Sequence, residues 1–162
     1  MRHETEITLT VNGRDYEVRV EPRRTLADTL RDECGLTGTN SGCEHGICGS
    51  CTVLADGDPV RACLMFAVQA QGKQIRTVEG LADGDRLHPL QQAFIDHHGL
   101  QCGFCTPGFL MLAAGVLERE PGISDADLRE ALSSNLCRCT GYQNILKAVR
   151  AAAAQMRAGN RG

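Results

Sequence analysis

Residues 5–20 alternate apolar and polar side chains, which is the pattern of strands that bury one face. The apolar positions form two runs: Ile7, Leu9 and Val11, then Tyr16, Val18 and Val20. Asn12-Gly13 separates the runs, and this dipeptide favours the two-residue turn of a β-hairpin. A second short hairpin is predicted around Asp56-Gly57, and residues 73–80 are predicted to add a further strand.

Residues 25–36 switch to the helical period, with Leu26 and Leu30 on one face. Thr25 and Asp28 suit a capping box at the start of this helix, and Gly35 suits a stop at its end. The first 78 residues or so therefore predict a mixed sheet wrapped on one helix.

From about residue 86 the alternating pattern ends, and four helical segments follow at 88–99, 106–120, 124–135 and 141–156. Pro89 lies near the start of the first segment. Thr106 is expected to cap the second, with Pro107 at its first helical position, and Ser124 is expected to cap the third. Four helices with short connections indicate a small antiparallel bundle.

The chain has 162 residues, enough for one large domain or two small ones with thin cores. Small domains with thin cores usually depend on a metal, a disulfide or a partner. There are nine cysteines, and the charged start "MRHETEITLT" predicts no secretory signal. Because disulfides are rare in proteins that are not secreted, metal ligation in a cytoplasmic protein is the leading explanation of the cysteines.

The overall charge and hydropathy limit the possible partners. The formal net charge of −3 argues against nucleic acid, because no basic stripe exists to neutralise phosphates. No stretch approaches the roughly 20 apolar residues of a membrane helix, so no membrane span is expected.

Four cysteines lie in the first half: Cys43, Cys48, Cys51 and, after eleven further residues, Cys63. The C-x4-C-x2-C opening is the spacing of plant-type [2Fe–2S] ferredoxins. Three glycines in the loop (Gly42, Gly46 and Gly49) would let the backbone turn its N–H groups toward a cluster at close range. Structural zinc is the alternative, although zinc loops usually come as paired C-x2-C knuckles.

Four more cysteines lie in the second half: Cys102 and Cys105 in "QCGFC", then, after thirty-one residues, Cys137 and Cys139 in "CRC". The bundle would bring the two pairs together at the ends of helices. A one-residue gap within a turn can direct two thiolates at one iron, whereas a zinc site could be built with similar spacing. The ninth cysteine, Cys34, is expected within the first helix as a small apolar residue rather than a ligand.

Taken together, the motifs "GCEHGICGSCTV", "QCGFCTPG" and "NLCRCTGYQNI" resemble the small iron–sulfur subunit of the molybdenum hydroxylases, the xanthine oxidase family. Its members include carbon monoxide dehydrogenase and nicotine and quinoline oxidoreductases. The resemblance spans about residues 5–155. It implies an α+β fold: a ferredoxin-like β-grasp domain over residues 1–80 and a four-helix-bundle domain over residues 81–162, each with one [2Fe–2S] cluster.

The same resemblance implies an electron-transfer role without substrate chemistry in this chain. In the family, electrons pass from a molybdopterin centre in a large subunit to the helical-domain cluster. They continue through the N-terminal cluster to FAD in a medium subunit, and a dimer of heterotrimers is expected. By this similarity Gln101 would hydrogen-bond the pterin and Cys139 would lie beside it. The alternative for Gln101 is a polar residue in a solvated loop.

Glu44-His45 stands where the carbon monoxide dehydrogenase small subunits tend to have Asp-Thr, which favours an organic substrate such as an N-heterocycle, an aldehyde or an aromatic acyl-CoA. Two other functions stay open at this point. One is a free-standing two-cluster ferredoxin, and the other is a zinc-stabilised interaction module without a redox role.

Overall fold

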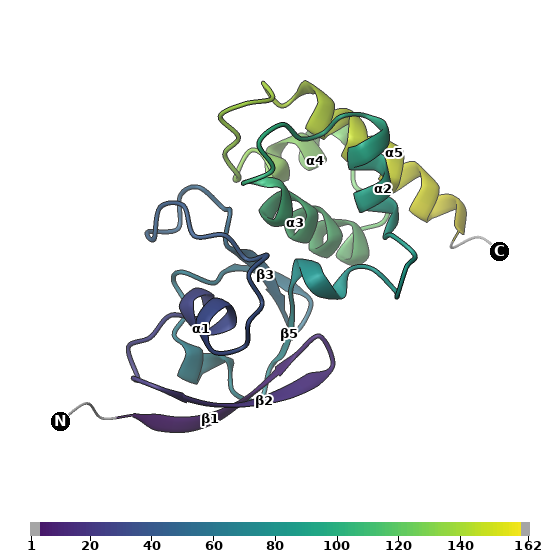
Figure 1. Cartoon of the computed structure of the whole chain (residues 1–162). Coiled ribbons are helices and arrows are strands. Elements are labelled where there is room, and N and C mark those ends of the chain that lie inside the picture. The colour runs from purple at the N-terminus through teal and green to yellow at the C-terminus, as the bar shows by residue number, and fades with distance from the viewer. Residues whose placement is uncertain (1–3, 160–162) are drawn as a thin grey trace.

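The strands form one mixed sheet in the order β2-β1-β5-β3-β4, within a computed structural model that describes residues 4–159 (Figure 1). The strands are β1 (Thr5–Val11), β2 (Arg14–Val20), β3 (Thr52–Ala55), β4 (Asp58–Arg61) and β5 (Gln74–Arg76). β1 and β5 run parallel, while the β1–β2, β3–β4 and β3–β5 pairs are antiparallel. This arrangement confirms a mixed sheet in the first half of the chain.

Both predicted hairpin turns are present. Asn12 and Gly13 connect β1 to β2 with φ values of 53° and 76°, and Asp56 and Gly57 connect β3 to β4 with φ values of 53° and 90°. Two successive positive φ values are characteristic of the type I′ turn, whose twist matches that of the strands it joins. The residue types of the two turns therefore determine the pairing of both hairpins.

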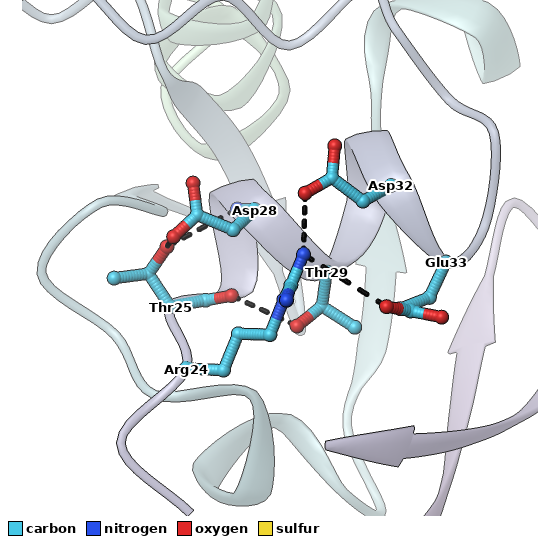
Figure 2. A network of polar contacts seen from close by, with 6 residues as sticks. All are labelled: Arg24, Thr25, Asp28, Thr29, Asp32 and Glu33. Carbon is cyan, nitrogen blue, oxygen red and sulfur yellow. Dashed lines mark hydrogen bonds and ion pairs between the residues drawn. The ribbon is translucent and has the colours of Figure 1, made fainter. Parts of the chain in front are cut away.

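Helix α1 (Leu26–Asp32) packs on the sheet and begins at the predicted cap. The Thr25 hydroxyl oxygen accepts a hydrogen bond from the Asp28 N–H at 3.1 Å and donates to the Asp28 carboxylate at 2.7 Å (Figure 2). Arg24 pairs with Asp32 and lies 3.8 Å from the Glu33 carboxylate. These contacts join the segment that leads into the helix to both ends of the helix.

The second half contains four helices: α2 (Pro89–Asp96), α3 (Thr106–Arg119), α4 (Asp125–Leu132) and α5 (Gln143–Gly159). Single 3₁₀ turns lie at η1 (Ala67–Ala70) and η2 (Val78–Gly80). Pro89 lies at the start of α2 and Ser124 caps α4, as predicted. In α3, however, Cys105 occupies the cap position and Thr106 is the first helical residue, so Pro107 lies at the second helical position and not at the first. The predicted α+β class is confirmed, while the boundary between residues 80 and 81 stays a prediction.

The two regions pack directly against each other through α3. Leu54 of β3 is buried in the same apolar cluster as α2–α5. A β-carbon at Gly115 of α3 would lie only 2.7 Å from a Leu54 side-chain atom and 2.7 Å from Pro59, so only glycine allows this approach. Within residues 4–159, no helix is both long and apolar enough to cross a membrane.

Candidate metal centres

The loop between α1 and β3 contains three of the predicted ligands and folds back on itself. Glu44, Gly46 and Gly49 have positive φ values of 56°, 82° and 73°. This path directs the Cys48 N–H at the Cys43 sulfur, with an N···Sγ distance of 3.4 Å. The hydrogen bond is the main reason that the pKa of the Cys43 thiol is lowered to about 6, because N–H donors favour the thiolate.

Cys51 and Cys63 lie side by side at the base of this loop, one just before β3 and the other just after β4. Their thiols are hydrogen-bonded, and both residues are buried. Burial is the main reason that the pKa of Cys51 is raised to about 12, and the neighbouring thiols of Cys63 and Cys48 raise it further. The four predicted N-terminal ligands therefore lie within one small region.

Glycine is required at position 49 because a side chain there would collide with Asn135 of the helical region, and not because a sulfur atom lies close to it. A β-carbon at Gly49 would fall 1.9 Å from the Asn135 Oδ1 atom, and φ is 73°. Gly42 is the loop glycine nearest a sulfur, since a β-carbon there would lie 3.2 Å from Cys48 Sγ and 3.1 Å from the Phe104 ring. Figure 1 shows this loop extending toward the segments that precede α3 and α5.

The second group of cysteines gathers where α3 begins and where α4 connects to α5. Cys139 Sγ lies 3.5 Å from Cys102 Sγ, and the thiols of Cys105 and Cys137 are hydrogen-bonded to each other. Burial is the main reason that the pKa of Cys105 is raised to about 12. These contacts bring the four predicted C-terminal ligands together from two separate segments of the chain.

Two residues after the CRC motif surround Cys137 with polar contacts. The Thr140 N–H donates to Cys137 Sγ at 3.4 Å, and the Thr140 hydroxyl lies 3.1 Å from the same sulfur. The Tyr142 hydroxyl accepts a hydrogen bond from the Cys137 N–H at 3.0 Å. Burial opposes ionisation of Cys137, but the hydrogen bonds from Thr140, Cys139 and Cys105 together outweigh it and the pKa is lowered.

Within each group the thiols associate in pairs. The pairs are Cys43 with Cys48, Cys51 with Cys63, Cys102 with Cys139, and Cys105 with Cys137. Across the described part of the chain, no three His, Cys, Asp or Glu side chains converge on a point that could hold a single metal ion. Four thiols are the ligand set of a [2Fe–2S] cluster, and a tetrahedral zinc ion uses the same number.

The two cysteines of the CRC motif have different nearest thiols. Cys139 Sγ lies 3.5 Å from Cys102 Sγ, whereas Cys137 interacts with Cys105. Which of these thiolates share an iron stays a prediction.

Gln101 and Cys139 are both exposed, on the outer side of the helical group. Cys34 lies just beyond α1 and not within it, half-buried against the apolar core of the sheet region. It belongs to neither group, as expected for a residue whose role is packing.

Four residues that shape the two groups were not predicted from the sequence: Arg61, Asn135, Thr140 and Tyr142. Thr140, three residues after Cys137, could have been recognised from the preference of Ser and Thr for short-range hydrogen bonds. Arg61 could not, because its partners lie up to 73 positions away in the chain.

Two family profiles match the chain. Residues 9–82 match the 2Fe-2S iron-sulfur cluster binding domain, and residues 77–150 match a second [2Fe-2S] binding domain. Each profile includes one complete group of four cysteines.

Individual relatives match over most of their own length. The chain is 58% identical to the caffeine dehydrogenase subunit gamma of Pseudomonas sp. (strain CBB1) over 147 residues, 89% of this chain and 88% of that protein. It is 58% identical over 144 residues to the nicotine 6-hydroxylase small subunit of Paenarthrobacter nicotinovorans, covering 89% and 87%. A chain of quinoline 2-oxidoreductase from Pseudomonas putida 86 superposes with a TM-score of 0.91 at 52% identity, covering 96% and 98%.

Proposed function

The chain belongs to the small [2Fe–2S] subunits of the xanthine oxidase family of molybdenum hydroxylases, and from this membership we propose how it relays electrons. Electrons enter from a molybdopterin-bearing large subunit at the helical region. They leave from the sheet region to FAD in a medium subunit. No substrate chemistry takes place in this chain.

The observation that supports this proposal most directly is the association of eight thiols in two groups of two pairs. We assign Cys43, Cys48, Cys51 and Cys63 to the N-terminal cluster, and Cys102, Cys105, Cys137 and Cys139 to the helical-domain cluster. A [2Fe–2S] cluster, when bound, accepts and passes on a single electron.

The residues around the sulfurs have the properties that such clusters require. N–H groups of Cys48 and Thr140 are directed at Cys43 and Cys137. Hydrogen bonds to ligand sulfurs stabilise the thiolate and raise the reduction potential of a cluster. Cys51 and Cys105 are shielded from water by burial, which raises their pKa as free thiols and makes them stable ligands once deprotonated.

Exposed apolar side chains next to each group support contact with partner subunits. Near the helical group they are Leu100, Phe104 and Leu136, and in the sheet region they are Ile47, Leu64 and Phe66. Apolar side chains that gather at the surface are typical of protein interfaces. We propose that the first set docks on the large subunit, where Gln101 hydrogen-bonds the pterin and Cys139 lies beside it. The second set then docks on the medium subunit.

The names of the relatives suggest the substrate class. Caffeine, nicotine and quinoline are N-heterocycles, and we propose that the complete enzyme hydroxylates a compound of this class, as a dimer of heterotrimers. We also propose a cytoplasmic location for this enzyme.

Site-directed variants of the holoenzyme test the direction of electron flow. Cys102→Ser should leave the N-terminal cluster intact by electron paramagnetic resonance (EPR) but prevent its reduction by substrate. In Cys48→Ser, substrate should still reduce the helical-domain cluster, but the electrons should stop there and the flavin should stay oxidised. A Cys48→Ser enzyme that reduces flavin at the wild-type rate would contradict the relay.

A visible absorption spectrum distinguishes the relay from the zinc-stabilised module. Zinc thiolates are colourless, whereas oxidised iron–sulfur clusters absorb in the visible. If this chain purifies without large and medium subunits and still exchanges electrons with a diffusing partner protein, it would instead be a free-standing ferredoxin.

A further inference from the structure

Arg61, at the end of β4, connects the two cysteine groups. Its guanidinium donates to the Ser134 carbonyl at 2.9 Å and lies 3.2 Å from the Ser134 hydroxyl. The same group donates to the Thr52 hydroxyl and, at 3.4 Å, to the Gly46 carbonyl. Arg61 thus contacts the N-terminal cysteine loop and the segment that leads to Cys137.

Two further hydrogen bonds join these segments beside Arg61. The Leu136 N–H donates to the Cys48 carbonyl at 2.9 Å, and the Asn135 side-chain amide donates to the Gly49 carbonyl at 3.2 Å. Asn135 is almost completely buried. Cys48 is a ligand in one group and Leu136 is covalently bonded to Cys137 of the other, so this contact is a direct link between the two groups.

The geometry of the guanidinium, and not only its charge, suits this connection. Within residues 4–159 no carboxylate forms an ion pair with Arg61, and its partners are carbonyl and hydroxyl oxygens on three separate segments. A planar fork with five N–H donors can serve several acceptors at fixed angles, which a lysine ammonium on a flexible stem cannot do.

We propose that Arg61 is a positioning residue for the electron step between the two clusters. It fixes the segment of Ser134 and Leu136 against the N-terminal loop, and thereby fixes the separation of Cys48 and Cys137. This inference rests on the proposed function. The step transfers one electron and requires no proton and no further reactant.

Three variants of the holoenzyme test this role. Arg61→Gln removes the fork and the charge, Arg61→Lys keeps the charge alone, and Arg119→Gln is the matched control. Arg119 also connects the two regions, through an exposed ion pair with Asp58 at 3.1 Å, but it contacts neither cysteine group. Iron content is measured first, so that all variants are compared with both clusters present.

Three measurements then apply: the magnetic interaction between the two reduced clusters by EPR, the intercluster rate after flash reduction, and hydrogen exchange of the Leu136 amide. In Arg61→Gln and Arg61→Lys we expect a weaker magnetic interaction and faster Leu136 exchange. The intercluster rate should fall roughly tenfold or more, since displacements of about 1 Å can strongly slow steps that depend on geometry. Arg119→Gln should match wild type in all three.

Wild-type behaviour of Arg61→Gln would overturn the proposal, and so would full rescue by Arg61→Lys, which would assign the effect to charge. If Arg61→Gln loses a cluster, Arg61→Lys decides, because it keeps the charge and removes the planar set of N–H donors: faster Leu136 exchange supports the role, and unchanged exchange overturns it. A wild-type protein with zinc or a single cluster would contradict the proposed function, while the exchange of Leu136 would still test the Arg61 contact.

Discussion

Among single side chains, the nine cysteines differ in what surrounds their sulfur atoms. Burial is the main reason that the pKa of Cys34 is raised to about 11, and the nearby Glu33 carboxylate raises it further. Cys43 and Cys137 instead receive hydrogen bonds that lower the pKa. A raised pKa alone does not separate Cys34 from the proposed ligands, because the pKa values of Cys51 and Cys105 are raised as well; Cys34 differs because no second thiol contributes to its pKa shift.

We therefore expect Cys34→Ala to retain both clusters and to lose about 1 kcal/mol of unfolding free energy, because only packing against the sheet core is removed. Iron analysis and urea unfolding measure the two effects. Cys51→Ala is the matched control and should lose the N-terminal cluster. Loss of either cluster's EPR signal in Cys34→Ala would show that the cysteines are divided incorrectly.

Thr140→Val removes the hydroxyl that lies 3.1 Å from Cys137 Sγ and keeps the backbone N–H. Because hydrogen bonds to ligand sulfurs raise the reduction potential, the midpoint potential of the helical-domain cluster should fall. The N-terminal cluster should keep its potential. A redox titration followed by EPR measures both potentials. Thr10→Val is a control, because the Thr10 hydroxyl donates to Asp15 within the β1–β2 hairpin and contacts neither cysteine group. An unchanged helical-domain potential would show that the hydroxyl contact is unimportant.

At the scale of helices and strands, α2 begins with an unusual cap. The neutral His88 Nδ1 atom accepts a hydrogen bond from the Leu90 N–H at 3.2 Å. Burial is the main reason that the pKa of His88 is lowered from its usual 6.5. Protonation converts the acceptor into a donor, so the cap functions only while the imidazole is neutral.

This cap predicts a pH-dependent stability. Since the folded-state pKa is below the unfolded value, the contribution of His88 is complete above about pH 6.5 and is lost as the pH falls toward the folded-state pKa. His88→Asn provides a cap that does not titrate, so its unfolding free energy should decrease less between pH 8 and pH 5.5, by about 1 kcal/mol. Urea unfolding at both pH values measures this difference. His98→Asn, an exposed position, should behave as wild type; equal pH dependence in all three proteins would contradict the assignment.

Local chemistry explains which elements could be predicted from the sequence. Asn12-Gly13 and Asp56-Gly57 define their turns by adjacent residues alone, and Ser124 caps α4 through Asp127 only three positions away. The cap of α3 was predicted one position too late, at Thr106, because Cys105 takes the cap position without a side-chain hydrogen bond. The spacing of the cysteines identified the two groups, but their pairing depends on how α3 meets the α4–α5 connection. No local pattern encodes that contact.

For the whole molecule, two clusters should change both metal content and charge. Four cysteines in each group predict about four irons per chain, and each oxidised cluster with four thiolates adds about two negative charges. The formal charge of −3 would then become about −7. Metal analysis and native electrophoresis of the loaded and cluster-free chains measure these changes. Two irons, stoichiometric zinc or identical mobility of the two forms would contradict the assignment.

The close approach of α3 to the sheet restricts how chains of this kind can be recombined. Leu54 is 1% exposed because it is covered by the helical region, and Gly115 leaves room for it and for Pro59. A hybrid that joins residues 1–80 to the helical half of a relative must preserve this match. Glycine opposite a bulky β3 residue is compatible, whereas any larger residue at 115 would force the halves apart. The two halves can therefore be exchanged between relatives only where the residues that meet at this contact fit together.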